Sequence, residues 1–205
     1  WLKSQRKVTE PWIDLMGRSS HVAKMFKDEK TLTKLRSIWN DVDERFKNTL
    51  KGKKITMALE LSGGPLKVGD IFPYDTDVYD IHGYCRSLSQ FKGKQMLLYF
   101  NSYGCKPCVD AKKELAELAD SMKDMIEIIG LNVDAPDVWK GKGQNTTVDW
   151  YDFNELKRSY GLSSRLDAMG IPTFMIVSKE GRILDVWAGY REGMITERIN
   201  EALKQ

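Results

Sequence analysis

Two cysteines, separated by two residues, are the side chains in this sequence best suited to chemistry. They lie in Cys105-Lys106-Pro107-Cys108, which follows an apolar run that ends near Phe100. Residues three apart on a helix are neighbours, so the pair can close a short disulfide. A helix N-terminus favours a thiolate over a thiol. We therefore expect Cys105, at the helix tip, to attack a substrate disulfide and Cys108 to attack the mixed disulfide that results.

The two residues between the cysteines fit this chemistry. Lys106 places a positive charge beside the attacking sulfur, which should lower the pKa of the Cys105 thiol further. Pro107 falls in the first helical turn, where a missing backbone N–H costs nothing.

Two structural uses of the cysteine pair are less favourable. A closed zinc site needs four ligands, and the candidates to complete it are Cys85, His82 and His21, none of which forms a second pair at this spacing. A structural disulfide across so short a loop gains little stability from chain entropy. The pattern therefore favours redox exchange.

The segments around the pair alternate between strands and helices. The run 95–101 is nearly continuous in apolar residues, which is typical of a strand buried on both faces. With the helix from Cys105 and the next run, 126–133, it predicts a parallel pair joined by a right-handed crossover. Other expected elements are a hairpin at 76–88, a helix near 153–160, strands at 173–178 and 183–188, and a helix at 192–203. The fold class is therefore α/β, with a mixed central sheet flanked by helices.

Residues 1–60 have a different, mostly helical pattern. Start and stop residues predict helices over about 9–17, 19–28 and 31–52, and the apolar residues at 55–61 indicate a short strand. The third helix is amphipathic and needs a partner surface. We hypothesise that 1–60 packs on the rest of the chain and restricts which substrates reach Cys105.

Composition excludes several classes of function. The 32 basic and 29 acidic residues give a net charge of +3, which is too balanced to indicate nucleic acid as a partner. No apolar run approaches the roughly 20 residues that span a bilayer. Three cysteines are too few for a disulfide scaffold. Any signal peptide or lipid anchor is expected upstream of Trp1.

Five further segments carry a family resemblance: Val68-Gly69-Asp70, Ser87 to Lys94, Phe100 with the cysteine pair, Gly170-Ile171-Pro172-Thr173, and Gly189-Tyr190. Together they resemble the thioredoxin superfamily, and more closely its TlpA/ResA-like branch. The resemblance implies a thioredoxin-like domain at 65–205 behind an N-terminal helical extension at 1–64, with the boundary in Ser62-Gly63-Gly64-Pro65. It also implies a four- or five-stranded core with Pro172 in cis, beside the cysteines. The backbone of Ile171 would then pair with an extended substrate segment.

Three positions depart from the family pattern: Gly104 replaces its Trp, Tyr99 its buried acid and Ala111 its Glu. Asp110 and Glu114 are expected to be ordinary exposed helix charges. Water is therefore expected to take the proton of Cys108. The long connection 134–152 carries aromatic residues that are expected to anchor it.

The resemblance implies a thiol–disulfide oxidoreductase that reduces or exchanges disulfides in extracytoplasmic proteins. The expected site comprises the catalytic Cys105 and Cys108 with the motif and substrate-binding residues Lys106, Pro107, Ile171, Pro172 and Thr173. The expected partners are protein disulfides or dithiols and a membrane electron donor, with no cofactor, metal or nucleic acid. The expected location is the periplasm, with a membrane anchor in a segment outside this chain.

The direction of electron flow stays open, and so do other functions. Copper delivery would use the same thiolates, although the motif of that family is Cys-x-x-x-Cys with a distant His, and the spacing here is one residue shorter. A redox-switched assembly module would use residues 1–60 to bind a partner. A peroxiredoxin is disfavoured because Leu98 replaces the proline of that family's loop.

Overall fold

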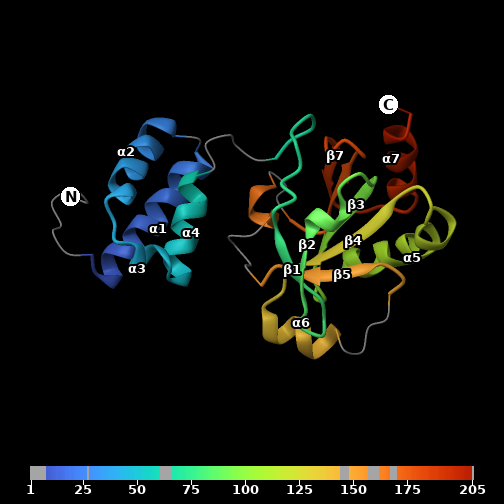
Figure 1. Ribbon diagram of the computed structural model, residues 1–205, viewed down its shortest axis with the longest axis horizontal. Coiled ribbons are helices and arrows are strands. Elements are labelled where there is room, and N and C mark those ends of the chain that lie inside the picture. The colour runs from blue at the N-terminus through green and yellow to red at the C-terminus, as the bar shows by residue number, and fades with distance from the viewer. Residues whose placement is uncertain are drawn as a thin grey trace. The chain divides into compact units, whose positions relative to one another are not determined.

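The structure, a computed structural model, describes residues 8–26, 28–60, 66–143, 148–156, 162–166 and 170–204. The chain divides into two compact units, Trp1–Gly64 and Pro65–Gln205. In its described residues the first unit is helical, and the second contains the strands (Figure 1).

The helical unit has its own hydrophobic core. Its helices are α1 (Glu10–Met25), α2 (Glu29–Asn40), α3 (Glu44–Lys47) and α4 (Leu50–Glu60). Asp28 caps α2, because its carboxylate accepts a hydrogen bond from the Thr31 backbone N–H at 3.0 Å. Trp12 and Trp39 stack in the core with ring centroids 6.3 Å apart.

The helix boundaries predicted for this unit are partly wrong. Gly17 does not end the first helix, and α1 continues through the second predicted helix. At Gly17 a Cβ would lie 3.6 Å from Ile55, so α1 and α4 approach closely there. The segment 55–61 is helical up to Glu60 rather than a strand, because Ile55 and Leu59, four residues apart, enter one core.

Gly52 also has a different role from the one predicted. It lies inside α4, and the predicted helix 31–52 is divided among α2, α3 and the start of α4. A Cβ at Gly52 would lie 2.0 Å from the carbonyl oxygen of Phe46. Only glycine fits at this position in the first turn of α4, which lies against the end of α3.

The second unit is built on one seven-stranded mixed sheet. Its strands are β1 (Asp77–Tyr79), β2 (Cys85–Ser87), β3 (Met96–Asn101), β4 (Glu127–Asn132), β5 (Tyr151–Asn154), β6 (Thr173–Val177) and β7 (Ile183–Ala188). Their order is β2-β1-β5-β4-β3-β6-β7. β3, β4 and β5 are parallel, and the other neighbours pair antiparallel. The predicted mixed sheet, hairpin and β3–helix–β4 unit are confirmed, with more strands than the four or five expected.

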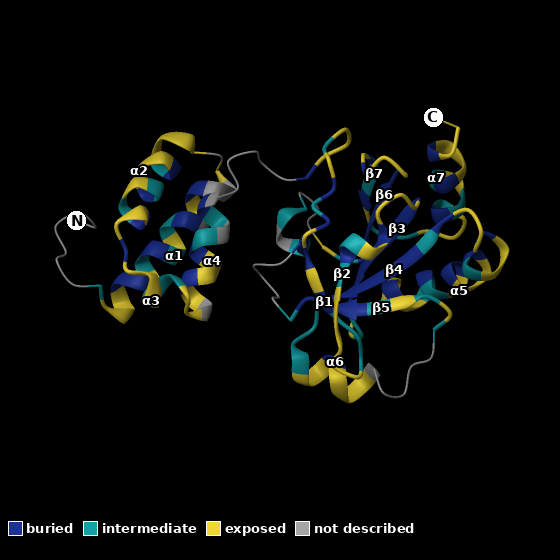
Figure 2. Ribbon diagram, viewed as in Figure 1, coloured by how far each residue is buried: buried dark blue, intermediate teal, exposed yellow. Residues whose placement is uncertain are grey.

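The two faces of the sheet are covered differently. Helices α5 (Lys106–Ser121) and α7 (Met194–Ala202) pack on one face. The 3-10 helices η2 (Leu88–Phe91) and η4 (Leu162–Arg165) contribute to the core on the other face, together with Phe72 and Tyr74. All residues of β3 and β6 are buried, as the dark central strands of Figure 2 show. The strand that leads to the cysteine pair is therefore held on both sides.

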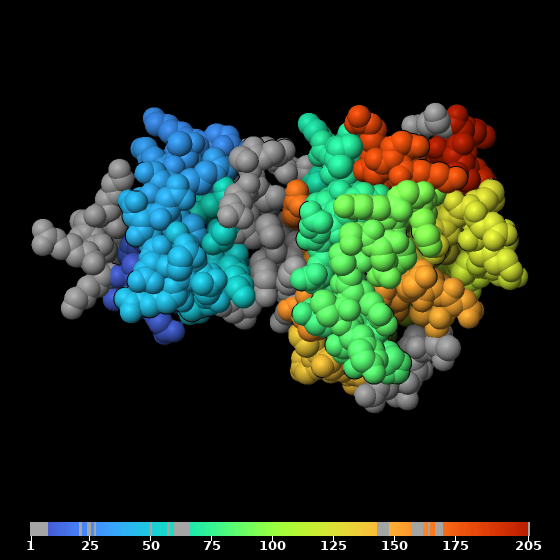
Figure 3. Space-filling model, in the orientation of Figure 1, coloured from blue at the N-terminus to red at the C-terminus, as the bar shows by residue number. Residues whose placement is uncertain are grey.

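The strand β5 was not predicted. A helix was expected near 153–160, but Tyr151–Asn154 is a strand that pairs with β4 and with Tyr79 of β1. Aromatic residues suit a pleated surface, and Tyr151 packs edge-on against Phe91 at 4.8 Å. Figure 3 shows the surfaces of β5 and of the β1–β2 hairpin side by side. Residues 157–160 lie outside the described residues.

The segment after β4 also contains an element that the sequence did not reveal. Helix α6 (Pro136–Gly143) lies within the long connection 134–152, for which no helix was predicted. Its Trp139 is completely buried. The expectation that an aromatic residue anchors this connection is confirmed for Trp139.

Candidate active site

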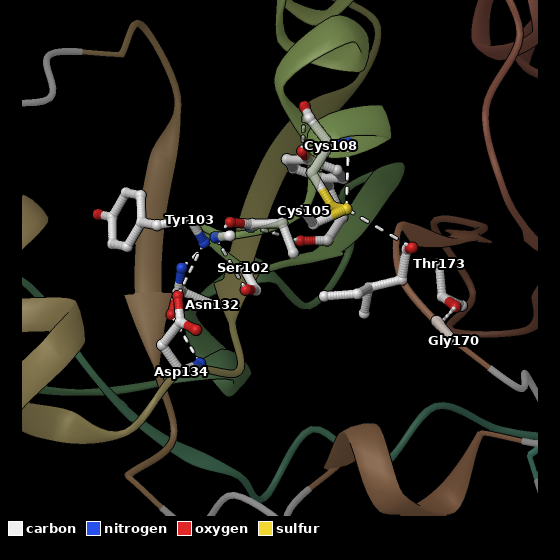
Figure 4. Close-up of a disulfide and its surroundings, with 12 residues drawn as sticks. Ser102, Tyr103, Cys105, Cys108, Asn132, Asp134, Gly170 and Thr173 are labelled. Atoms are coloured by element: carbon white, nitrogen blue, oxygen red, sulfur yellow. Dashed lines mark hydrogen bonds between the residues drawn. A yellow bond between two sulfur atoms is a disulfide. The ribbon is translucent and has the colours of Figure 1, made fainter.

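The two cysteines form a disulfide at the N-terminus of α5. Their Cα atoms are 5.2 Å apart. Cys105 is the N-cap residue, and its Sγ accepts a hydrogen bond from the Cys108 backbone N–H at 3.1 Å (Figure 4). This N–H stabilises negative charge on the sulfur after reduction. Cys105 is half-buried and Cys108 is 1% exposed, so Cys105 is the sulfur that a substrate can reach.

The loop before β6 faces Cys105. The Ile171–Pro172 peptide bond is cis, which confirms the expectation from the family resemblance. The carbonyl oxygen of Ile171 lies 3.5 Å from Cys105 Sγ (Figure 4). The Thr173 hydroxyl donates to the Gly170 carbonyl at 2.7 Å, and the Pro172 carbonyl accepts from a backbone N–H just after β7 at 2.8 Å. The loop backbone is thereby held beside the attacking sulfur.

The residues around Cys105 leave it open to solvent. Lys106 is exposed, and its ammonium lies 3.7 Å from the Asp110 carboxylate, so its charge is partly offset. Pro107 falls in the first turn of α5, as expected. A Cβ at Gly104 would meet only Ser102 Oγ, at 3.9 Å. The replacement of the family's Trp by glycine therefore leaves space at the approach to the disulfide.

A network of buried asparagines holds the loop that leads into the cysteine pair. Asn101, Asn132 and Asn154 end the parallel strands β3, β4 and β5 in register. Asn132 donates to Asn101 at 3.2 Å and accepts from the Asp134 N–H at 2.9 Å, and Asn154 donates to the Asp134 carbonyl at 3.1 Å. The Asp134 carboxylate in turn accepts from the Tyr103 N–H at 2.8 Å (Figure 4). The sheet edge therefore fixes the backbone two residues before Cys105.

Tyr99 supports the inner cysteine from the sheet. Its hydroxyl donates to the Cys108 carbonyl at 2.7 Å, and its ring stacks on Phe174 with centroids 5.2 Å apart. Burial, and to a smaller extent the charge of Asp152, raises the pKa of Tyr99. The phenol is therefore neutral at physiological pH and is not a base for Cys108.

Comparison with known proteins shows what this unit is similar to. Residues 93–183 match the family model described as thioredoxin-like. The second unit has a thioredoxin-like fold.

The chain is also similar to proteins of known name. The chain is similar to thioredoxin-like protein YneN of Bacillus subtilis, with 27% identity over 117 residues, 56% of this chain and 68% of the relative. It is similar to thiol-disulfide oxidoreductase ResA of Bacillus thuringiensis subsp. konkukian, with 28% identity over 138 residues, 62% of this chain and 72% of the relative. The crystal structure of a putative thiol:disulfide interchange protein DsbE from Chlorobium tepidum shares the fold, with a TM-score of 0.56, 22% identity, and coverage of 67% of this chain and 99% of that chain. The resemblance to the ResA-like branch is confirmed.

Glu114 corrects an expectation for the thioredoxin-like domain. It was expected to be an exposed helix charge, but its side chain is buried between α5 and α7. Its carboxylate accepts hydrogen bonds from the Gly193 N–H at 3.1 Å, the Thr196 N–H at 2.8 Å and the Thr196 hydroxyl at 2.7 Å. The N-cap residue of α7, Gly193, has no side chain to do this. Glu114 therefore caps α7 from a different helix.

The asparagine network and Glu114 are the features of the site that the sequence did not reveal. Asn101 and Asn132 each end an apolar run, and parallel strands end at one edge of a sheet, so this pair carried a usable signal. Asn154 carried none, because β5 was not predicted. Among the described residues, no group of three or more His, Cys, Asp or Glu side chains is placed to hold a metal ion, and no helix is long and apolar enough to cross a membrane.

Proposed function

We propose that this protein is a thiol–disulfide oxidoreductase that acts on cysteine pairs of other proteins. The observation that carries the proposal is the Cys105–Cys108 disulfide at the N-terminus of α5, with Ile171 of the cis-proline loop 3.5 Å from the outer sulfur. The similarity to a relative named thiol-disulfide oxidoreductase supports the same class of reaction.

The proposed reaction is reversible disulfide exchange. In the reducing direction, the Cys105 thiolate attacks one sulfur of a substrate disulfide, and the other substrate sulfur leaves as a thiolate. Cys108 then loses its proton and attacks Cys105 in the mixed disulfide. The Cys105–Cys108 bond forms, the second substrate sulfur leaves, and two electrons have passed to the substrate. A dithiol partner restores the reduced pair by the reverse steps.

Substrate would bind along the loop Ile171-Pro172-Thr173. The loop lies against Cys105, and the open space at Gly104 leaves room for a polypeptide. An extended substrate segment that pairs with the Ile171 backbone would bring its own sulfur to the outer cysteine. Lys106 and Pro107, both exposed on the first turn of α5, would border the segment on the other side.

We further propose an extracytoplasmic location, most simply the periplasm, with electrons supplied by a membrane protein. The support is the resemblance to the TlpA/ResA-like branch. In this proposal residues 65–205 carry the chemistry, and residues 1–64 form a separate helical domain that restricts substrate access. The division of the chain into two compact units at Gly64 and Pro65 supports that boundary.

The proposal is tested by the redox equilibrium of the cysteine pair with glutathione, read by trapping free thiols. The experiment uses the full chain with Cys85→Ser, since Cys85 is an exposed free thiol that would confuse the count. A reversible two-electron couple is expected, and Cys105→Ser should abolish it. In Cys108→Ser a mixed disulfide with a substrate protein should accumulate. If no couple appears and Cu(I) binds instead, copper delivery replaces the enzyme proposal.

A further inference from the structure

The proposed resolving step requires a base close to Cys108. This cysteine is 1% exposed, so its thiol cannot lose a proton directly to bulk water. Glu114 is engaged by three hydrogen bonds from α7 and its approach, Asp110 is paired with a lysine near the helix surface, and Tyr99 is neutral. A further carboxylate, Asp152, lies on the same face of the sheet.

The strand register brings Asp152 beneath α5. Tyr99 of β3, Gly130 of β4 and Asp152 of β5 are partners in adjacent parallel strands. Register partners point to the same face, and Tyr99 belongs to the core under α5. Gly130 leaves its place on that face empty, and a Cβ there would lie 2.9 Å from Asp152 Oδ1 and 3.3 Å from Trp150 Nε1. The Asp152 carboxylate therefore lies over Gly130 and is directed from β5 toward β3.

The ionisable groups that face Asp152 come from α5 and β3. Lys112 of α5 lies one helical turn after Cys108, and its positive charge favours the ionised carboxylate. Tyr99 of β3 bonds the Cys108 carbonyl, and the Asp152 charge acts on its phenol. On β4 the facing residue is Gly130, without a side chain. Burial raises the pKa of Asp152 to about 6, against the effect of Lys112.

We propose that Asp152 is the proton acceptor for Cys108 in the resolving step. The inference rests on the proposed function. The Cys108 thiol gives its proton through one water to the Asp152 carboxylate. The resulting thiolate attacks Cys105, and the bond between Cys105 and the substrate sulfur breaks. The substrate leaves as a thiolate, and Asp152 returns the proton to solvent or to that thiolate. A carboxylate that titrates just below neutral pH is ionised and ready for this transfer.

The resolving step can be measured separately with an aromatic disulfide such as Ellman's reagent. Reduced full-length protein with Cys85→Ser releases one aromatic thiolate when Cys105 attacks and a second when Cys108 resolves the mixed disulfide. The second rate is followed from about pH 5 to pH 9 in the parent protein and in Asp152→Asn. Asp149→Asn is the matched control, because Asp149 is an exposed carboxylate three residues earlier.

We expect the second rate of the parent to fall as the pH drops through about 6, where Asp152 takes up a proton. Asp152→Asn should lose this inflection and resolve at least about tenfold more slowly at neutral pH, with the first release unchanged. Asp149→Asn should match the parent, and Asp152→Glu should restore the inflection. An Asp152→Asn protein with the parent's rate and pH profile would overturn the proposal.

A second variant tests the same idea without touching the carboxylate. Lys112→Gln removes the charge that favours ionised Asp152, so the inflection should move to higher pH. An unmoved inflection would also count against Asp152, even if Asp152→Asn failed to fold. If no first release occurs in the parent, the proposed function itself fails. If both releases occur without dependence on Asp152, only this inference fails.

Discussion

Removal of Glu114 should destabilise the thioredoxin-like domain through the N-terminus of α7. The carboxylate accepts hydrogen bonds from two backbone N–H groups, of Gly193 and Thr196, and from the Thr196 hydroxyl. In Glu114→Ala both N–H groups lose their acceptor, in a position that is only partly open to water. The hydroxyl can turn to another partner.

The magnitude follows from these contacts. A hydrogen bond to a charged group contributes roughly 1.5–3 kcal/mol, and a negative charge at a helix N-terminus about 0.3–1 kcal/mol. Water will replace part of the two backbone bonds, so we expect Glu114→Ala to cost ~3 kcal/mol. Glu114→Gln keeps a carbonyl oxygen that can accept from Thr196, but it places an uncharged amide N–H₂ opposite the Gly193 N–H. We expect its cost in folding free energy to be about half that of Glu114→Ala.

The assay should report on this domain alone, because the chain has two compact units and two-state analysis applies to single domains. Native-state hydrogen exchange of the β3 and β6 amides in the full chain gives the free energy of opening of the sheet. Glu117→Ala is the control, since Glu117 is an exposed acid on the same helix and should change stability by less than about 0.5 kcal/mol. If Glu114→Ala were no more destabilising than Glu117→Ala, the capping role would be refuted.

Three other outcomes are expected. Asp152→Asn should stabilise the domain by up to ~3 kcal/mol at pH 7 but not near pH 4. Folding raises the pKa of Asp152 from 3.8 to about 6, so the parent protein loses stability as the pH rises through this window. Equal effects of the substitution at both pH values, measured by hydrogen exchange, would contradict this. Tyr99→Phe should cost about 1 kcal/mol by losing the bond to the Cys108 carbonyl, while the first release of aromatic thiolate is retained. Asp134→Ala should free the Tyr103 N–H and slow that first release, and an unchanged rate would argue against a positioning role.

The sequence was sufficient for the parts of the site that depend on local pattern. The apolar run of β3 and the cysteine at a helix start both have signals within a few residues, and both were predicted correctly. The cis bond before Pro172 followed from a family motif. By contrast, Gly17 carries a helix-stop signal that loses to packing, because α1 gains a close contact with Ile55 by continuing. Tertiary contacts override local propensity in such cases.

The unpredicted features share a physical cause, which is that they join segments distant in sequence. Glu114 reads as an exposed acid until α7 is placed against it, 79 residues later in the chain. β5 is only four residues long, and its aromatic residues fit a strand edge and a helix equally well until β4 and β1 pair with it. The role of Asn154, and with it the asparagine network, depends on that pairing.

The same dependence explains how this domain can lack the family's acid at Tyr99 and still have a carboxylate on the face of the sheet that α5 covers. A tyrosine at that position on β3 fills the space beneath Cys108 and bonds its carbonyl, which leaves no room there for a base. Two strands away, Asp152 can substitute only because the residue between them is Gly130, which lets the carboxylate lie across the sheet. The residues at positions 99, 130 and 152 therefore depend on one another. Gly130→Ala adds only a methyl group, but it should slow the resolving step because it displaces the Asp152 carboxylate.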